Sequence, residues 1–188
     1  LAQLSDEVGG SFAVTWDPDY TEIYIATTKD QLSAAVELLA ETLISPKINA
    51  SAVEAAKTML RSDMERAGND AFRSAYDEMR RLLYRDSPYR RRLLGEQSAV
   101  DKISAADVQQ FIGKWFVPGN MVLAVVGDVS VQQTQDAVKL WFGKQQSAAA
   151  PRREPIATES GPQRPPSLLE VDSNSSYLVA GTLASGMA

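Results

Sequence analysis

Residues 118–129 read Pro-Gly-Asn-Met-Val-Leu-Ala-Val-Val-Gly-Asp-Val, a continuous apolar run between two turn-forming groups. The Pro-Gly-Asn group ends a preceding helix, because proline lacks a backbone donor and glycine and asparagine favour turns. The run 121–126 then predicts a strand that is buried on both faces or nearly so. This stretch therefore indicates a domain in which helices and a sheet pack together.

Two segments near the start of the chain predict a β-hairpin. Residues 11–16 and 20–27 are rich in β-branched and aromatic residues, and the Asp-Pro-Asp sequence at 17–19 has turn chemistry. The Gly-Gly pair at 9–10 is expected to end an opening helix, since glycine adopts the left-handed backbone that terminates helices. The predicted fold class is α+β, with a largely antiparallel sheet packed with helices.

Helical periodicity begins at Leu32, and apolar residues recur three and four positions apart in five segments. Capping boxes are expected at Ser51, Ser104 and Ser130, where a carboxylate or glutamine follows three positions later. The first of these helices should stop at Pro46. The core-facing residues expected on the five helices are Leu32, Ala35, Val36, Leu39 and Leu43; Val53, Ala56, Leu60 and Met64; Phe72, Ala75, Tyr76, Met79 and Leu83; Val108, Phe111, Ile112 and Trp115; and Ala137, Val138, Trp141 and Phe142.

A change of composition divides the chain of 188 residues, which is long enough for one core and the start of another. Residues 143–166 are rich in alanine, glutamine, serine and arginine and contain five prolines. Such a stretch buries too little apolar surface to offset the entropy lost on ordering. We expect a first domain at 1–142, a linker at 143–166, and the first strands of a second domain at 167–188, within 167–171 and 176–182.

The chain contains no histidine and no cysteine. Nucleophilic arrangements that need an imidazole as general base are therefore excluded, and we expect no catalytic residue in this chain. A catalytic zinc site usually takes at least one imidazole, so we expect no cofactor held by this chain alone. Cysteine usage does not resolve the compartment, because the bacterial envelope or periplasm and the cytoplasm are both compatible with it.

The formal net charge of −5 and the isoelectric point near 4.8 argue against phosphate binding as the main function. No run of about 18 apolar residues that could span a bilayer occurs. The first seven residues lack the basic and apolar regions of a signal peptide, and they predict the middle of a helix. We therefore expect the chain to begin inside a larger protein.

Six arginines lie between positions 80 and 92, and a nucleic-acid surface would look like this locally. Acidic residues at 77, 78, 86 and 96 interleave with them. We therefore favour a solvated loop or a salt-bridge surface over nucleic acid, with a polyanion contact left open by the triple arginine at 90–92. The arginines are Arg80, Arg81, Arg85, Arg90, Arg91 and Arg92.

A series of landmarks runs through the chain: Gly9-Gly10, Tyr20-Thr21, Leu39-Ala40-Glu41, Pro88, Leu94-Gly95, Ile103-Ser104, Phe116, Pro118-x-Asn120-Met121-Val122 and Val126-Gly127-Asp128-Val129. Their order and spacing over roughly residues 4–142 resemble the insulinase/pitrilysin family of zinc metallopeptidases, the inverted H-x-x-E-H zincins. The resemblance implies an insulinase-like half-unit followed by the start of a second similar domain. Such halves close around a chamber that holds a peptide.

The resemblance also implies where zinc would bind. The two histidine ligands and the general-base glutamate lie on an H-x-x-E-H helix that would precede Leu1, and a glutamate on a later helix is the third ligand. Ungapped register from Pro88 assigns Asp63 to that third position, with Ala56 where the family tends to carry a supporting glutamate. Aspartate is one methylene shorter, and metal sites tolerate only tenths of an ångström. Asp63 is therefore the candidate metal ligand, and a solvated position on a helix flank is the alternative.

A second site follows from the same resemblance. The strand Phe12, Ala13, Val14 and Thr15 matches the strand to whose edge a substrate peptide adds in active relatives, although Ala13 replaces their asparagine. Edge pairing uses main-chain groups and would survive this change, whereas a side-chain contact would not. The alternative is an ordinary strand of the sheet. Proline at Ala13 or Thr15 should weaken peptide capture at whichever residue points its N–H outward.

Three functions stay open. In the first, the chain is a non-catalytic half or subunit that completes a peptide-holding chamber with a homologous zinc-bearing partner. In the second, it is a fragment of an active zinc endopeptidase, with H-x-x-E-H upstream and Asp63 as third ligand. In the third, it is an assembly protein without peptide chemistry. We favour the first, because residues 13, 56 and 63 all depart from the active pattern.

Overall fold

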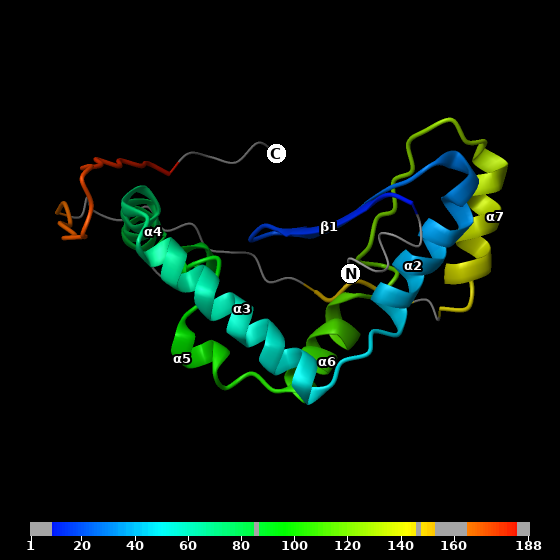
Figure 1. Cartoon of the computed structure of the whole chain (residues 1–188), viewed down its shortest axis with the longest axis horizontal. Coiled ribbons are helices and arrows are strands. Elements are labelled where there is room, and N and C mark those ends of the chain that lie inside the picture. The colour runs from blue at the N-terminus through cyan, green and yellow to red at the C-terminus, as the bar shows by residue number, and fades with distance from the viewer. Residues whose placement is uncertain (1–8, 85–86, 146–147, 153–164, 184–188) are drawn as a thin grey trace. The chain divides into compact units, whose positions relative to one another are not determined.

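The computed structural model describes residues 9–84, 87–145, 148–152 and 165–183. Helices predominate, and a small antiparallel sheet completes an α+β fold, which confirms the predicted class (Figure 1). The predicted opening helix at residues 1–7 lies outside the described residues. The elements are β1 (Ser11–Trp16), β2 (Thr21–Ala26), the 3-10 helix η1 (Lys29–Gln31), α2 (Leu32–Ile44), α3 (Ala50–Gly68), α4 (Ala71–Leu83), the 3-10 helix η2 (Pro88–Arg90), α5 (Gln97–Val100), α6 (Ala105–Trp115) and α7 (Val131–Phe142).

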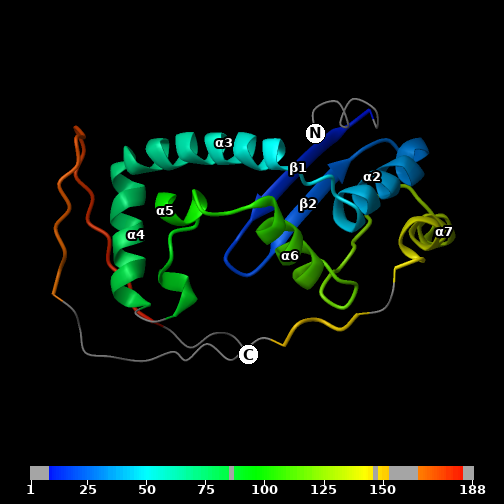
Figure 2. The same ribbon diagram turned by 90° about the horizontal axis from the view of Figure 1, so that it is seen from below.

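The chain forms two compact units, and the first comprises Leu1–Asn49 and Ala105–Arg152. In this unit α2 and α7 lie side by side (Figures 1 and 2). The indole N–H of Trp141 on α7 donates to the hydroxyl of Ser33 on α2 over 3.4 Å. The buried side chains come mainly from α2. They are Ala35, Val36, Leu38 and Ala40 of α2 and Ala137 of α7. Leu38 and Ala40 are buried although they lie outside the apolar face that the sequence predicts for this helix.

The second unit comprises Ala50–Ser104 and Arg153–Ala188. Its helices are α3, α4 and α5, and residues 165–183 run beside α4 (Figure 2). The rings of Phe72 and Tyr177 meet edge to face with centroids 5.6 Å apart. A Cβ on Gly181 would lie 2.5 Å from the sulfur of Met79, so this segment approaches α4 closely.

Helix boundaries follow local chemistry in most places. Ser130 and Gln133 form the predicted capping box of α7, each side chain satisfying the other's backbone N–H. Asp70 caps α4 by accepting from the N–H of Arg73 over 3.0 Å. The capping box predicted at Ser51 is wrong, because α3 begins at Ala50 and Ser51 therefore lies in its first turn. The residue before the helix is Asn49, which is as favourable a capping type as serine.

Three predicted strands do not form. Residues 121–126, 167–171 and 176–182 have no strand assignment, and β1 and β2 are the two strands that the described residues contain. Val122 and Val126 are 96% and 99% exposed, so the run 121–126 is not buried on both faces. A strand exists only where a second backbone pairs with it, and no described segment pairs with these three.

Most of the predicted linker at 143–166 lies outside the described residues, but its first part is held in place. The N–H of Gly119 donates to the carbonyl of Ala148 over 2.9 Å, and Gly119 pairs with Ala149 in an isolated parallel bridge. A Cβ at position 119 would lie 2.5 Å from the Ala148 oxygen. Glycine is therefore required for this close approach.

Within the described ranges, the helices are too short or too polar for any of them to cross a bilayer.

Candidate functional site

The strand β1 has one hydrogen-bonded edge and one open edge within the described structure. It pairs antiparallel with β2, from Ser11 opposite Ala26 to Trp16 opposite Thr21, and no other described strand lies next to it. In a two-stranded sheet each strand has one unpaired edge, so the peptide-binding edge that the sequence predicts for this strand stays a prediction (Figure 1).

The turn of the hairpin fixes which backbone groups face the open edge. The N–H of Asp17 donates to the carbonyl of Tyr20 over 2.9 Å, so this pair is hydrogen-bonded. Hydrogen-bonded and non-bonded pairs alternate along an antiparallel ladder. Ala13 and Thr15 therefore direct their N–H groups toward β2. The outward N–H and C=O groups belong to the alternate residues Phe12, Val14 and Trp16.

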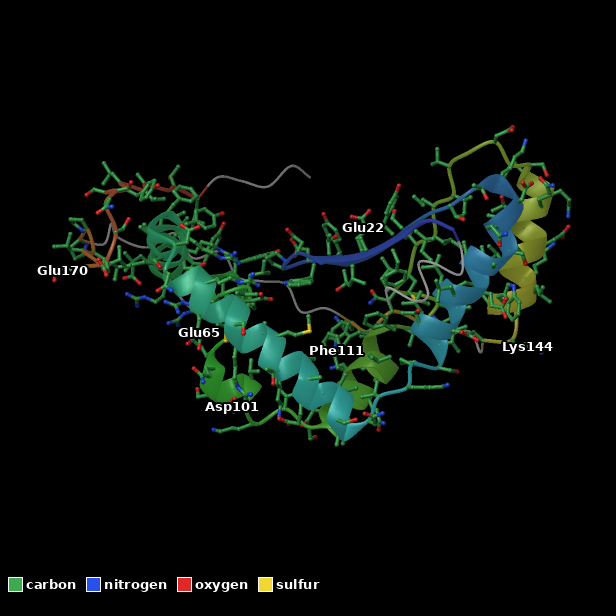
Figure 3. All side chains as sticks on the ribbon, viewed as in Figure 1. Glu22, Glu65, Asp101, Phe111, Lys144 and Glu170 are labelled. Atoms are coloured by element: carbon green, nitrogen blue, oxygen red, sulfur yellow. The ribbon has the colours of Figure 1, made fainter. Side chains whose placement is uncertain are left out.

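The hairpin also has two unlike faces, because residues directly opposite each other in the register share a face. One face, which we call the apolar face, consists of Phe12, Val14 and Trp16 with Thr21, Ile23 and Ile25. The other, the small-residue face, consists of Ser11, Ala13 and Thr15 with Glu22, Tyr24 and Ala26. Side chains stand out on both sides of the hairpin ribbon, Glu22 among them (Figure 3).

Asp63, the candidate metal ligand, lies on α3 and forms an ion pair with Arg66 one turn later. The same face of the helix presents Ala56 and Met59, because residues three, four and seven positions apart align. Met59 is 71% exposed. No group of three or more His, Asp or Glu residues that could hold a metal ion occurs among the described residues. The described residues by themselves therefore do not form a three-ligand zinc site.

A second ionic cluster fixes α3 against α5. The ammonium of Lys57 is buried and donates to Glu54 over 2.8 Å and to the backbone carbonyl of Asp101 over 3.1 Å. The guanidinium of Arg61 donates to the Asp101 carboxylate over 2.7 Å. Asp101 lies beside α3 in Figure 3. This cluster was not predicted from the sequence, although the spacing of Glu54 and Lys57 is typical of a helical ion pair.

The arginine-rich segment is partly neutralised by acidic residues of α4. Arg81 donates two hydrogen bonds of 2.6 Å to the carboxylate of Glu78, and Arg92 lies 3.9 Å from Asp77. The guanidinium of Arg80 lies 6.0 Å from the ring centroid of Tyr76. This geometry favours the salt-bridge surface over a nucleic-acid surface. Arg85 lies outside the described residues.

The hydrogen bonds from Arg81 should lower the pKa of Glu78 measurably. The hydrogen bond from Arg81 is the largest cause that lowers the pKa of Glu78 below its ordinary value of 4.5, against the opposing effect of burial. A carboxylate with a lowered pKa stabilises the fold above its ordinary pKa, and this contribution is lost as the pH falls through the folded value. In Arg81→Gln we expect the pKa of Glu78 to rise, measured by NMR titration. Arg92→Gln should change it less, and equal shifts in both variants would contradict the assignment.

Asp128, one of the landmark residues in the sequence, forms an ion pair with Lys29. Its carboxylate accepts from the ammonium of Lys29 over 2.8 Å, and both side chains are mostly exposed. The pair borders a cavity of about 690 Å³ that is lined by η1, the start of α2 and α7. An exposed pair of this kind contributes little to stability.

Two peptidase family models together match most of the chain. The family model described as insulinase, peptidase family M16, matches residues 1–97, and the model described as peptidase M16 inactive domain matches residues 102–184. The chain belongs to the insulinase family, peptidase family M16. The predicted resemblance is confirmed.

Curated relatives agree with this assignment. An uncharacterized zinc protease of Mycobacterium tuberculosis is 26% identical over 87% of this chain and 37% of its own length. The mitochondrial-processing peptidase subunit beta of Saccharomyces cerevisiae is 22% identical over 84% of this chain and 34% of its own length. This chain therefore spans about a third of such relatives.

Two solved structures share the fold. A protease from Helicobacter pylori aligns with a TM-score of 0.76 and 19% identity over 84% of this chain and 38% of that chain. A peptidase M16 inactive domain from Pseudomonas fluorescens aligns with a TM-score of 0.74 and 23% identity over 83% of this chain and 39% of that chain. At these identities the likeness shows the fold alone.

Proposed function

We propose that this chain is a non-catalytic half or subunit of an M16-type zinc peptidase, which holds peptide and completes a chamber with a homologous zinc-bearing partner. The observation that carries the proposal is the set of residues that surrounds Asp63 on α3. Its carboxylate pairs with Arg66, on a helix face that also presents Ala56 and Met59. Asp63 is one methylene shorter than the glutamate that serves the family as third ligand, and this helix offers no second carboxylate on that face.

The named relatives support the pairing part of the proposal. One is a subunit of the mitochondrial-processing peptidase, and one solved neighbour is described as an inactive domain. The open edge of β1 supports the peptide-holding part, because exposed N–H and C=O groups can add an extended peptide. The domain division at 1–142, 143–166 and 167–188 belongs to the same proposal, with the second half beginning after the linker.

Two other functions have less support. A fragment of an active endopeptidase would use Asp63 as third zinc ligand, and the shorter aspartate together with Ala56 in place of a supporting glutamate weighs against this. An assembly protein without peptide chemistry would need no free strand edge, and β1 has one among the described strands. The zinc in the proposed assembly therefore resides on the partner.

Metal analysis tests the first part of the proposal. We expect the protein to retain far less than one zinc per chain after dialysis against metal-free buffer, because it has no imidazole or thiolate. Adding the zinc-bearing partner should bring one zinc per assembled pair. One tightly held zinc per chain in the absence of a partner would contradict the proposal.

A further inference from the structure

The register of the hairpin determines which side chains would flank a peptide that adds to β1. Backbone groups of Phe12, Val14 and Trp16 face the open edge, so an added strand forms its hydrogen bonds with these residues. Peptide residues directly opposite these three would lie on the apolar face. The alternate peptide residues would lie on the small-residue face, beside Ala13 and Thr15.

The two faces offer different surfaces to those residues. On the apolar face, Val14 is 38% exposed and Trp16 is 51% exposed, so both can contact an incoming side chain. Aromatic and β-branched cross-strand pairs are the favourable ones. On the small-residue face, β1 contributes serine, alanine and threonine, which give little apolar contact. Tyr24 of β2 is 54% exposed on this face, but it lies one strand farther from the added peptide, so apolar peptide residues gain more on the apolar face.

Charge adds a second preference. Residues 11–26 include Asp17, Asp19 and Glu22 and contain no lysine or arginine. Glu22 lies on the small-residue face, opposite Thr15. An acidic peptide residue on that face would meet like charge, which is unfavourable between neighbouring strands.

We infer that β1 selects extended peptide segments that carry apolar residues at alternate positions and no acidic residues between them. This selection rests on the proposed peptide-holding function. The selection goes beyond that function, because capture through the backbone alone would accept a peptide of any sequence. The occupant is thus an amphipathic strand whose apolar side continues the row Phe12, Val14 and Trp16.

Three short fluorescent peptides of equal length test the selection on the full chain. The first alternates valine or phenylalanine with threonine, the second has the same composition in two blocks, and the third replaces threonine by glutamate. We expect the alternating peptide to bind about 5-fold more tightly than the block peptide, as two good cross-strand pairs predict. The glutamate peptide should bind more weakly still, and salt should reduce that difference.

Substitutions in β1 distinguish selection of the peptide by side chains from its capture through the backbone. Replacing Val14 by Thr and Trp16 by Ser should lower the affinity for the alternating peptide to about that for the block peptide, because the apolar contacts are lost and the backbone groups remain. Thr15→Ser, on the other face, should preserve the preference, and circular dichroism should show all variants folded. Equal binding of the three peptides would overturn the selection and leave capture standing. Absence of binding by every peptide would overturn the peptide-holding function and the selection with it.

Discussion

Val14→Pro should weaken peptide capture by about 10-fold or more and leave the protein folded. Proline removes the N–H that Val14 directs at the open edge, and its ring obstructs the approach of an added strand. A lost hydrogen bond accounts for about 1 kcal/mol of this effect, and the obstruction for the remainder. Fluorescence anisotropy with a labelled extended peptide measures the affinity, and circular dichroism monitors the fold.

Two matched variants make the result specific. Val14→Ala keeps the outward N–H and should retain backbone capture. Ala13→Pro removes an N–H that points toward Tyr24 of β2, so it should disrupt the hairpin itself. Wild-type affinity in Val14→Pro would show that no peptide adds at this edge.

Gly10→Ala should destabilise the protein by about 1–3 kcal/mol, the usual cost of forcing atoms into an occupied space. A Cβ on Gly10 would overlap the backbone carbonyl of Ala26, the last residue of β2. Backbone cannot move aside there without separating the two strands. Urea unfolding measures the change in free energy of unfolding.

The control for this variant is Gly113→Ala. Gly113 lies inside α6, and a Cβ there would meet no atom within 4 Å. Alanine is favoured over glycine in a helix by about 0.5–1 kcal/mol, so this variant should be more stable than the wild type. The same chemical change thus has opposite signs at the two positions, and equal effects would contradict the described geometry of the hairpin.

Local signals in the sequence predict the helices and the β1–β2 hairpin well, but they predict strands whose partner is distant in the chain poorly. The helix from Leu32 and the capping box at Ser130 depend on residues within one or two turns, which the sequence displays directly. The strand predicted at 121–126 depends on a partner distant in the chain. Apolar composition shows that a segment can form a strand, but it does not supply the second backbone.

The candidate site shows the same contrast. Some of its features depend on residues that are neighbours in the sequence, and others depend on contacts between strands. The position of β1 was predictable from its hairpin, yet the residues that face outward were not. Their identity depends on the hydrogen bond between Asp17 and Tyr20, which sets the phase of the ladder. The ion pair of Asp63 with Arg66 was predictable from helical spacing, because residues three positions apart are neighbours.

The most direct test of the non-catalytic assignment is Asp63→Ala in the complete assembly with its zinc-bearing partner. The Asp63–Arg66 pair is solvent-exposed on the Arg66 side, so its loss should cost less than about 1 kcal/mol of stability. Zinc content and peptidase activity of the purified assembly are the two readouts. We predict that both remain at the wild-type level, because the metal is held by the partner. Loss of zinc and activity together in a folded Asp63→Ala assembly would contradict the account and make Asp63 a metal ligand.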